Sequence, residues 1–183
     1  MSTEFFCRLA TVNDLKLIHV FLPGVIDAMQ ATGNYQWSDT YPTDVEFLND
    51  IKLKRLWVVA TRSIGVSVSG AEDVAGFAAI TMDQSPEYVQ CGWDITEEAV
   101  VAHRLCSNPR YRGKGVAQML YGQCEVVARD RGIKRLRVDT CSENIPMNSV
   151  IKKCGYLYVG QCSLGLTGKG EGHMFNCYER NLE

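Results

Sequence analysis

The residues from 103 to 117 constrain the fold of this chain more than any other segment. They read HRLCSNPRYRGKGVA: strand-forming residues, a turn marked by proline, and two glycines that open a long amphipathic helix. Gly113 and Gly115 let a ligand approach the backbone closely, and the first turn of a helix offers N–H groups without partners. With the cations of Arg112 and Lys114 beside these groups, the turn predicts a site for an anion such as a diphosphate.

Familiar nucleotide-binding motifs do not fit this turn. Gly113-Lys114 and Gly168-Lys169 are each followed by Gly rather than Ser or Thr, and the pattern G-x-G-x-x-G is missing from the turn, so neither a P-loop nor a dinucleotide fingerprint is complete. The glycines alone would equally suit a structural turn flanked by solvated cations. The rest of the chain must decide between these two interpretations.

The remaining sequence alternates short strands and helices, without a repeat or a linker, which predicts a single α/β domain over residues 1–183. A Gly/Ser-rich turn at 65–70 separates two of the strands, and Pro23 predicts a kink or break in the first helix. We expect strands at 5–9, 56–62, 74–82, 99–106, 136–140, 156–162 and 173–180, and helices at 11–33, 45–51, 115–131 and 148–153.

Charge and hydropathy argue against nucleic-acid and membrane partners. Nineteen Lys and Arg against 21 Asp and Glu give a formal net charge of -2, so no global positive field exists. Lys134, Arg135 and Arg137 form a small basic cluster that we interpret as a solvated strand edge. The longest apolar run, 74–82, is far shorter than the roughly 20 residues of a membrane span, and no export signal is apparent. We therefore expect a cytoplasmic protein with no nucleic-acid or membrane partner.

The cysteines and histidines do not have metal-ligand spacing. The chain has eight cysteines but no C-x-x-C pair, and its three histidines stand singly at 19, 103 and 173. Because a reducing compartment keeps thiols free, we expect neither disulfides nor a bound metal.

Four features together resemble the GNAT acyltransferase superfamily. Residues 112–117, RGKGVA, match the family signature R/Q-x-x-G-x-G/A, and they follow 105–109, LCSNP, which resembles its hydrophobic-x-V-x-P strand end. Asn144 stands at the place of the family's asparagine before the next helix, and 153–156, KCGY, resembles its K-x-G-F ending. The resemblance implies an α/β fold with a mixed, mostly antiparallel sheet of about six to seven strands and helices on both faces.

The resemblance also implies an N-acetyltransferase that uses acetyl-CoA as its donor substrate and no metal. A backbone N–H near Cys106 would polarise the thioester carbonyl, and Asn144 would contact the cofactor arm. The diphosphate would bind Arg112, Gly113, Lys114, Gly115, Val116 and Ala117, and the pantetheine arm would add alongside Leu105, Cys106 and Ser107 like a further strand.

Direct attack by a primary amine in a ternary complex needs a route for the amine's proton and a donor for the departing thiolate. The position where many family members carry a proton-donating tyrosine is Ile151 here. The conceivable substitutes as proton donors are Tyr156, Tyr178 and Cys154. The backbone N–H near Cys106 would stabilise the oxyanion.

His103 is the candidate base, because it lies on the strand beside the thioester and its ordinary pKa is near neutrality. The alternative is a histidine hydrogen-bonded near the core. Glu97 and Glu98, just before that strand, would either bind a cationic acceptor or sit on a solvated turn.

The aromatic loop at 33–42 contains Tyr35, Trp37 and Tyr41, which we interpret as candidate contacts for the acceptor, or else as anchors of the loop. The acceptor itself stays open: a small amine, an amino acid, or a protein N-terminus or lysine. Family members often form homodimers, and the sequence leaves a homodimer open. A catalytically weak acyl-CoA-binding or sensing module is the alternative function, favoured by Ile151.

Overall fold

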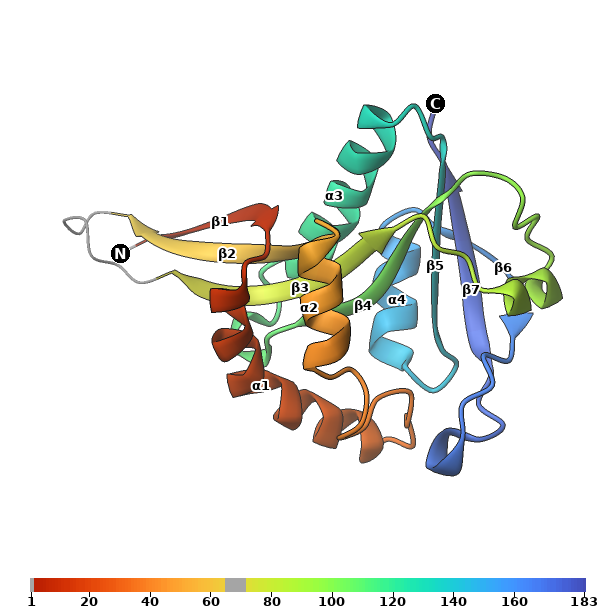
Figure 1. Cartoon of the computed structure of the whole chain (residues 1–183), viewed down its shortest axis with the longest axis horizontal. Coiled ribbons are helices and arrows are strands. Elements are labelled where there is room, and N and C mark those ends of the chain that lie inside the picture. Colours follow the sequence, from red (N-terminus) through yellow and green to blue (C-terminus); the bar gives the residue numbers. More distant parts are fainter. Residues whose placement is uncertain (1, 65–71) are drawn as a thin grey trace.

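A seven-stranded sheet with helices on both faces organises the chain in the computed structural model, which describes residues 2–64 and 72–183 (Figure 1). The predicted α/β fold class is therefore confirmed, while the expected turn at 65–70 lies outside the described residues. The elements in chain order are β1 (Ser2–Leu9), α1 (Val12–Gln30), α2 (Asp44–Lys52), β2 (Leu56–Ile64), β3 (Asp73–Thr81), the 3-10 helix η1 (Pro86–Cys91), β4 (Val100–Ser107), η2 (Pro109–Tyr111), α3 (Val116–Asp130), β5 (Arg135–Cys141), α4 (Ile145–Lys153), β6 (Leu157–Cys162), η3 (Gly168–Gly170) and β7 (Phe175–Asn181).

The strands lie in the order β1-β2-β3-β4-β5-β7-β6, and every neighbouring pair is antiparallel except β4 and β5. The parallel pair is short, because only Val100–Ala102 and Leu136–Val138 face each other. Beyond that point β4 and β5 diverge, as Figure 1 shows. The sheet is thus mixed and mostly antiparallel, as predicted, and it opens into a V at the carboxyl ends of its two central strands.

The two faces of the sheet carry different helices. Phe77 of β3 packs with Ile18 of α1 and Phe47 of α2 on one face, whereas Ala78 points to the other face, where Leu120 of α3 lies. This division follows from the alternation of side chains along a strand. It places α1 and α2 on the opposite side of the sheet from α3 and α4.

Two helices differ from the sequence prediction. Of the kink or break predicted at Pro23, the break is wrong: α1 runs through it, because the buried stripe that includes Leu15, Ile18 and Leu22 holds the helix on the sheet despite the lost hydrogen bond. The kink stays a prediction. Helix α4 begins at Ile145, three residues before the expected start at 148. The reason is the side chain of Asn144, which accepts a hydrogen bond from the N–H of Met147 at 3.3 Å and caps the helix.

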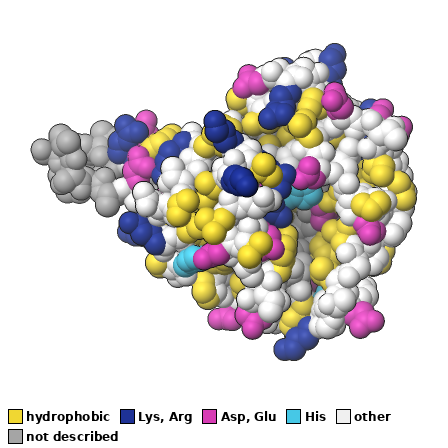
Figure 2. Space-filling model, in the orientation of Figure 1, with side chains coloured by type: hydrophobic (Ala, Val, Ile, Leu, Met, Phe, Trp, Pro, Cys, Tyr) yellow, Lys and Arg dark blue, Asp and Glu magenta, His cyan; other side chains and the backbone are white. Residues whose placement is uncertain are grey.

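The interpretation of the basic cluster as a solvated strand edge is wrong for Arg137, although Lys134 is exposed. Arg137 is only 1% exposed, and its Nε lies 2.9 Å from Oε2 of Glu179 while its guanidinium stacks over Trp93. Arg137 lies on β5, which is an interior strand of the sheet, because β4 pairs with one of its edges and β7 with the other. On the face in Figure 2, basic and acidic side chains are interspersed. None of the helices in the described part of the chain combines the length and apolar character that a membrane span requires.

Gly76 of β3 packs closely against the end of β4 and the start of α3. A Cβ at this position would lie 2.6 Å from the carbonyl oxygen of Cys106 and 2.6 Å from Cγ1 of Val116. Gly76→Ala should therefore lower the free energy of unfolding by about 1–3 kcal/mol, the usual cost of overpacking. Gly122→Ala is the matched control, since its Cβ meets nothing within 4 Å and alanine favours a helix. Urea unfolding measures both, and a neutral Gly76→Ala would contradict the close packing.

Candidate active site

A β-bulge bends β4 where it leaves β5. Phe77 faces Cys106 and Ala79 faces His103, so Arg104 and Leu105 together oppose the single residue Ala78. Arg104 adopts φ 52°, a left-handed conformation that is rare for a side chain of this size. Such strain persists only where the surroundings hold it in place.

Asp50 of α2 holds the bulge. Its carboxylate, 1% exposed, accepts from Nη2 of Arg104 at 2.6 Å and from Nε of Arg55 at 2.8 Å. Arg104 also donates to the hydroxyl of Tyr41 at 3.2 Å. These bonds fix the guanidinium on the α2 side of the sheet and balance its charge.

A groove of about 670 Å³ runs beside the end of β4, between the starts of α3 and α4 and the end of α1. It gathers nearly all of the residues that the sequence assigned to a cofactor. Lys114 is the exception, since it is exposed and does not line the groove. Those that line it are Leu105, Cys106, Ser107, Arg112, Gly113, Gly115, Val116, Ala117 and Asn144.

One end of the groove is suited to an anion. Gly113 and Gly115 both have φ 76°, a conformation that glycine adopts at little cost, and Gly115 forms the N-cap of α3. The first N–H groups of the helix therefore face outward without intrahelical partners. Arg112 is exposed at this end and supplies the positive charge.

A second cavity of about 300 Å³, here called the cleft, lies between the diverging strands β4 and β5. Its walls include Ala102 and His103 of β4, Val138 and Asp139 of β5, and Phe175 of β7. Groove and cleft share five lining residues: Gln36, Trp37, Leu105, Asn144 and Met147. A ligand extended along the groove would thus present its end to the cleft.

The three candidate catalytic residues lie in different places. His103 lines the cleft, and its Nε2 lies 3.0 Å from the carbonyl oxygen of Asp83. Because a carbonyl only accepts, Nε2 is the donor in this contact, and Nδ1 is the ring nitrogen left to accept a proton when the imidazole is neutral. Cys106 lines the groove, and burial raises the pKa of its thiol to about 12. Tyr178 lines neither cavity, and its hydroxyl donates to Oδ1 of Asn148 at 2.6 Å.

The aromatic loop is divided between the cavities and the core. Trp37 lines both cavities and stacks on Phe77 with ring centroids 6.3 Å apart, so it both lines the site and anchors the loop. Tyr41 lines the cleft beside Arg104. Tyr35 lines neither cavity and instead stacks on His173 at 6.1 Å.

Sequence reasoning missed three polar side chains of the cleft. Asp139 accepts a hydrogen bond from the hydroxyl of Tyr88 at 2.5 Å, and Tyr121 of α3 directs its hydroxyl at the sulfur of Met147, 3.7 Å away. No motif identified them, because η1 was not expected and Tyr121 resembles a core residue of an amphipathic helix. Alternation along the predicted strand at 136–140 was the one available signal for Asp139.

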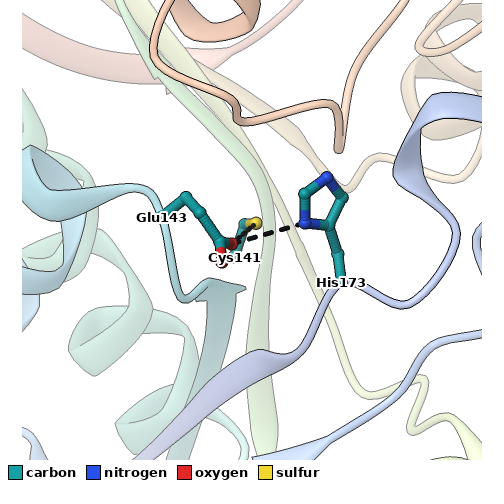
Figure 3. Close-up of side chains that lie close together, drawn as sticks. All are labelled: Cys141, Glu143 and His173. Atoms are coloured by element: carbon teal, nitrogen blue, oxygen red, sulfur yellow. Dashed lines mark hydrogen bonds and ion pairs between the residues drawn. The ribbon is translucent and has the colours of Figure 1, made fainter.

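Cys141, Glu143 and His173 form a separate cluster near the end of β5 (Figure 3). Oε2 of Glu143 accepts from the Cys141 thiol at 2.8 Å and lies 3.4 Å from Nδ1 of His173. Burial and the neighbouring carboxylate raise the pKa of the Cys141 thiol to about 12. The cluster is thus a hydrogen-bonded network around a protonated thiol, whereas a metal would require the thiolate. The absence of a metal stays a prediction.

Comparisons with known proteins give a consistent family. A model of the acetyltransferase (GNAT) family matches residues 23–156. A GNAT-family acetyltransferase from Streptococcus agalactiae has a similar structure, with 21% identity and a TM-score of 0.74 over 98% of this chain and 96% of that one. A ribosomal-protein-alanine N-acetyltransferase from Brucella melitensis also has a similar structure, with 16% identity and a TM-score of 0.65 over 97% of this chain and 99% of that one. No curated protein sequence matches the chain.

The ion pair at the bulge should dominate the stability of the site. Asp50→Ala leaves Arg104 partly buried without its counterion, so the free energy of unfolding should fall by about 3–5 kcal/mol. Glu72→Ala is the control: it removes a 40% exposed partner of Arg8, which should change stability by at most about 1 kcal/mol. Thermal unfolding compares the two, and equal losses would show that Asp50 does not hold the bulge.

Proposed function

The chain belongs to the GNAT family of acetyltransferases, and on that basis we propose that it transfers an acetyl group from acetyl-CoA to a primary amine by direct attack in a ternary complex. The observation that carries the proposal is the junction of groove and cleft at Leu105, Asn144 and Met147. The groove takes a long donor with an anionic diphosphate, and the cleft takes an acceptor at the donor's reactive end. We propose that the whole chain, 1–183, is one catalytic domain.

Backbone N–H groups and a positive charge of the protein would bind the donor. Its diphosphate would occupy the turn at 112–117, where the N–H groups at the start of α3 and the guanidinium of Arg112 converge. Its pantetheine arm would run along 105–107, because β4 no longer pairs with β5 beyond Ala102 and its amides are free to bond an added strand.

In the reaction the amine nitrogen attacks the carbonyl carbon of the thioester, and the C–S bond breaks as the tetrahedral intermediate collapses. A backbone N–H near Cys106 would stabilise the oxyanion. The proton lost by the attacking nitrogen would go to Nδ1 of His103, whose Nε2 is held by Asp83, and from there through solvent to the thiolate. From the neutral amine, the products are the amide and free CoA, because the proton lost by nitrogen equals the proton gained by the thiolate.

Stabilisation of the departing thiolate falls to a residue other than Ile151, which is fully buried and apolar. We propose Tyr121, because it lines the cleft beside Met147 and Asn144, and a thioether is the one acceptor that its hydroxyl has among the described residues. Burial keeps the pKa of this phenol well above its ordinary value, so it stays protonated. It would therefore act as a hydrogen-bond donor to the sulfur as negative charge develops.

Ile151 is also the observation that favours a second function, an acyl-CoA-binding or sensing module with little turnover. The two functions differ in one readout. Release of CoA thiol from acetyl-CoA that depends on an added amine identifies the enzyme, while saturable binding without release across a broad amine panel identifies the sensor.

The donor site is tested by calorimetric titration with acetyl-CoA. Arg112→Ala removes a charge-assisted hydrogen bond to the diphosphate, so Kd should rise about 10- to 150-fold. Lys134→Ala, an exposed cation outside the groove, should leave Kd unchanged. An unaltered Kd in Arg112→Ala would place the diphosphate elsewhere.

The role of Tyr121 is tested by removing only its hydroxyl. Tyr121→Phe should lower kcat about 10- to 150-fold, the scale of a hydrogen bond to a charged group, without changing Kd for acetyl-CoA. Tyr156→Phe is the matched control, because that ring lies 5.2 Å from Tyr121 but lines neither cavity, and its buried hydroxyl has no partner among the described residues. If the two variants have the same kcat, Tyr121 does not assist the leaving thiolate.

A further inference from the structure

Asp139 is a carboxylate in the cleft without a counterion. It lies on β5, partly buried, at the first position after β5 ceases to pair with β4. One oxygen accepts from Tyr88 at 2.5 Å, and the other accepts no hydrogen bond within the described residues. No Lys, Arg or His nitrogen of the described residues lies within ion-pair distance, and 65–71 contains none of these residue types.

Two other carboxylates beside the sheet, each mostly buried, are neutralised by guanidinium groups. Asp50 pairs with Arg104 and Arg55, and Glu179 pairs with Arg135 and Arg137. The two carboxylates that the sequence suggested for binding a cationic acceptor are not available in the cleft. Glu97 is bound to Arg135 at 3.0 Å, and Glu98 is exposed to solvent and does not line the cleft.

The groups that face Asp139 from every side leave its charge uncompensated. They are Tyr88 of η1, His103 of β4, Tyr121 of α3 and Cys177 of β7, and only the imidazole can become a cation. Burial raises the pKa of the Asp139 carboxyl, while His103 and the Tyr88 hydroxyl oppose that rise. A desolvated carboxylate is costly unless a cation joins it.

We infer that Asp139 binds the ammonium group of the acceptor, so that the acceptor is an aliphatic primary amine that enters the cleft as a cation. This inference rests on the proposed function. The open oxygen of Asp139 receives an N–H of the ammonium, and the remaining walls suit an alkyl chain, since Leu164, Leu166 and Phe175 line the cleft on the same side. His103 takes one proton from the ammonium and releases it to solvent, which leaves the neutral amine beside the thioester and frees the imidazole for the proton lost during attack. Overall, acetylation of the ammonium form releases one proton to solvent.

The test compares two acceptors that differ in charge at neutral pH: butylamine, an alkylammonium, and aniline, which is neutral. Asp139→Asn should raise KM for butylamine about 10- to 150-fold, the scale of a hydrogen bond between charged groups, while KM for aniline changes little. Glu98→Gln is the matched control and should leave both values unchanged. A lysine-containing peptide as a third acceptor separates a protein side chain from a free amine as the source of the ammonium.

A second variant tests the same site without removing the carboxyl. Tyr88→Phe deletes the hydrogen bond that stabilises the Asp139 carboxylate, so the pKa of this carboxyl should rise and less of it is ionised in mild acid. The acidic limb of kcat/KM for butylamine should therefore move to higher pH, and the profile for aniline should not move.

Equal losses with butylamine and aniline in Asp139→Asn, or an acidic limb unmoved by Tyr88→Phe, would overturn the inference. If no amine is acetylated at all, the proposed function fails, and calorimetric binding of butylammonium to the CoA-bound protein decides the site alone. Binding that is lost in Asp139→Asn supports the ammonium site, and its absence in the unaltered protein refutes it.

Discussion

The parting of β4 from β5 is the constraint on which the rest of the site depends. Two parallel strands that pair over three residues and then diverge leave amide and carbonyl groups without a strand partner, and these groups need water, another chain or a ligand to bond them. The bulge at Arg104 bends β4 away, and Asp50 holds the bulge from the other layer. The strands create the opening, and helices α1, α3 and α4 line the groove beside it.

This opening gives the site two chemically different ends. The end at the start of α3 offers backbone N–H groups and a guanidinium, so it attracts negative charge. The cleft holds a single uncompensated carboxylate, Asp139, among apolar and aromatic walls. Opposite charges would therefore enter from opposite ends and meet at Leu105 and Met147, where both cavities are lined by the same side chains.

The part of the site that sequence predicts is the part made by local structure. The turn at 112–117 and the helix after it depend on glycines, a proline and helical periodicity that stand next to one another in the chain. The pairing of Tyr88 with Asp139 joins residues 51 positions apart, and it needs both a 3-10 helix and the divergence of two strands. Arg137 was misplaced for a related reason, because its burial depends on β7, which follows 38 residues later in the chain and inserts between β5 and β6.

The five side chains shared by groove and cleft have a thermodynamic consequence. A molecule that settles in one cavity moves or orders walls of the other, so the two binding free energies are linked rather than additive. Linkage is reciprocal: whatever factor an occupied groove applies to affinity in the cleft, an occupied cleft applies to the groove. The order in which the two partners bind therefore does not change the total binding free energy of the doubly filled state.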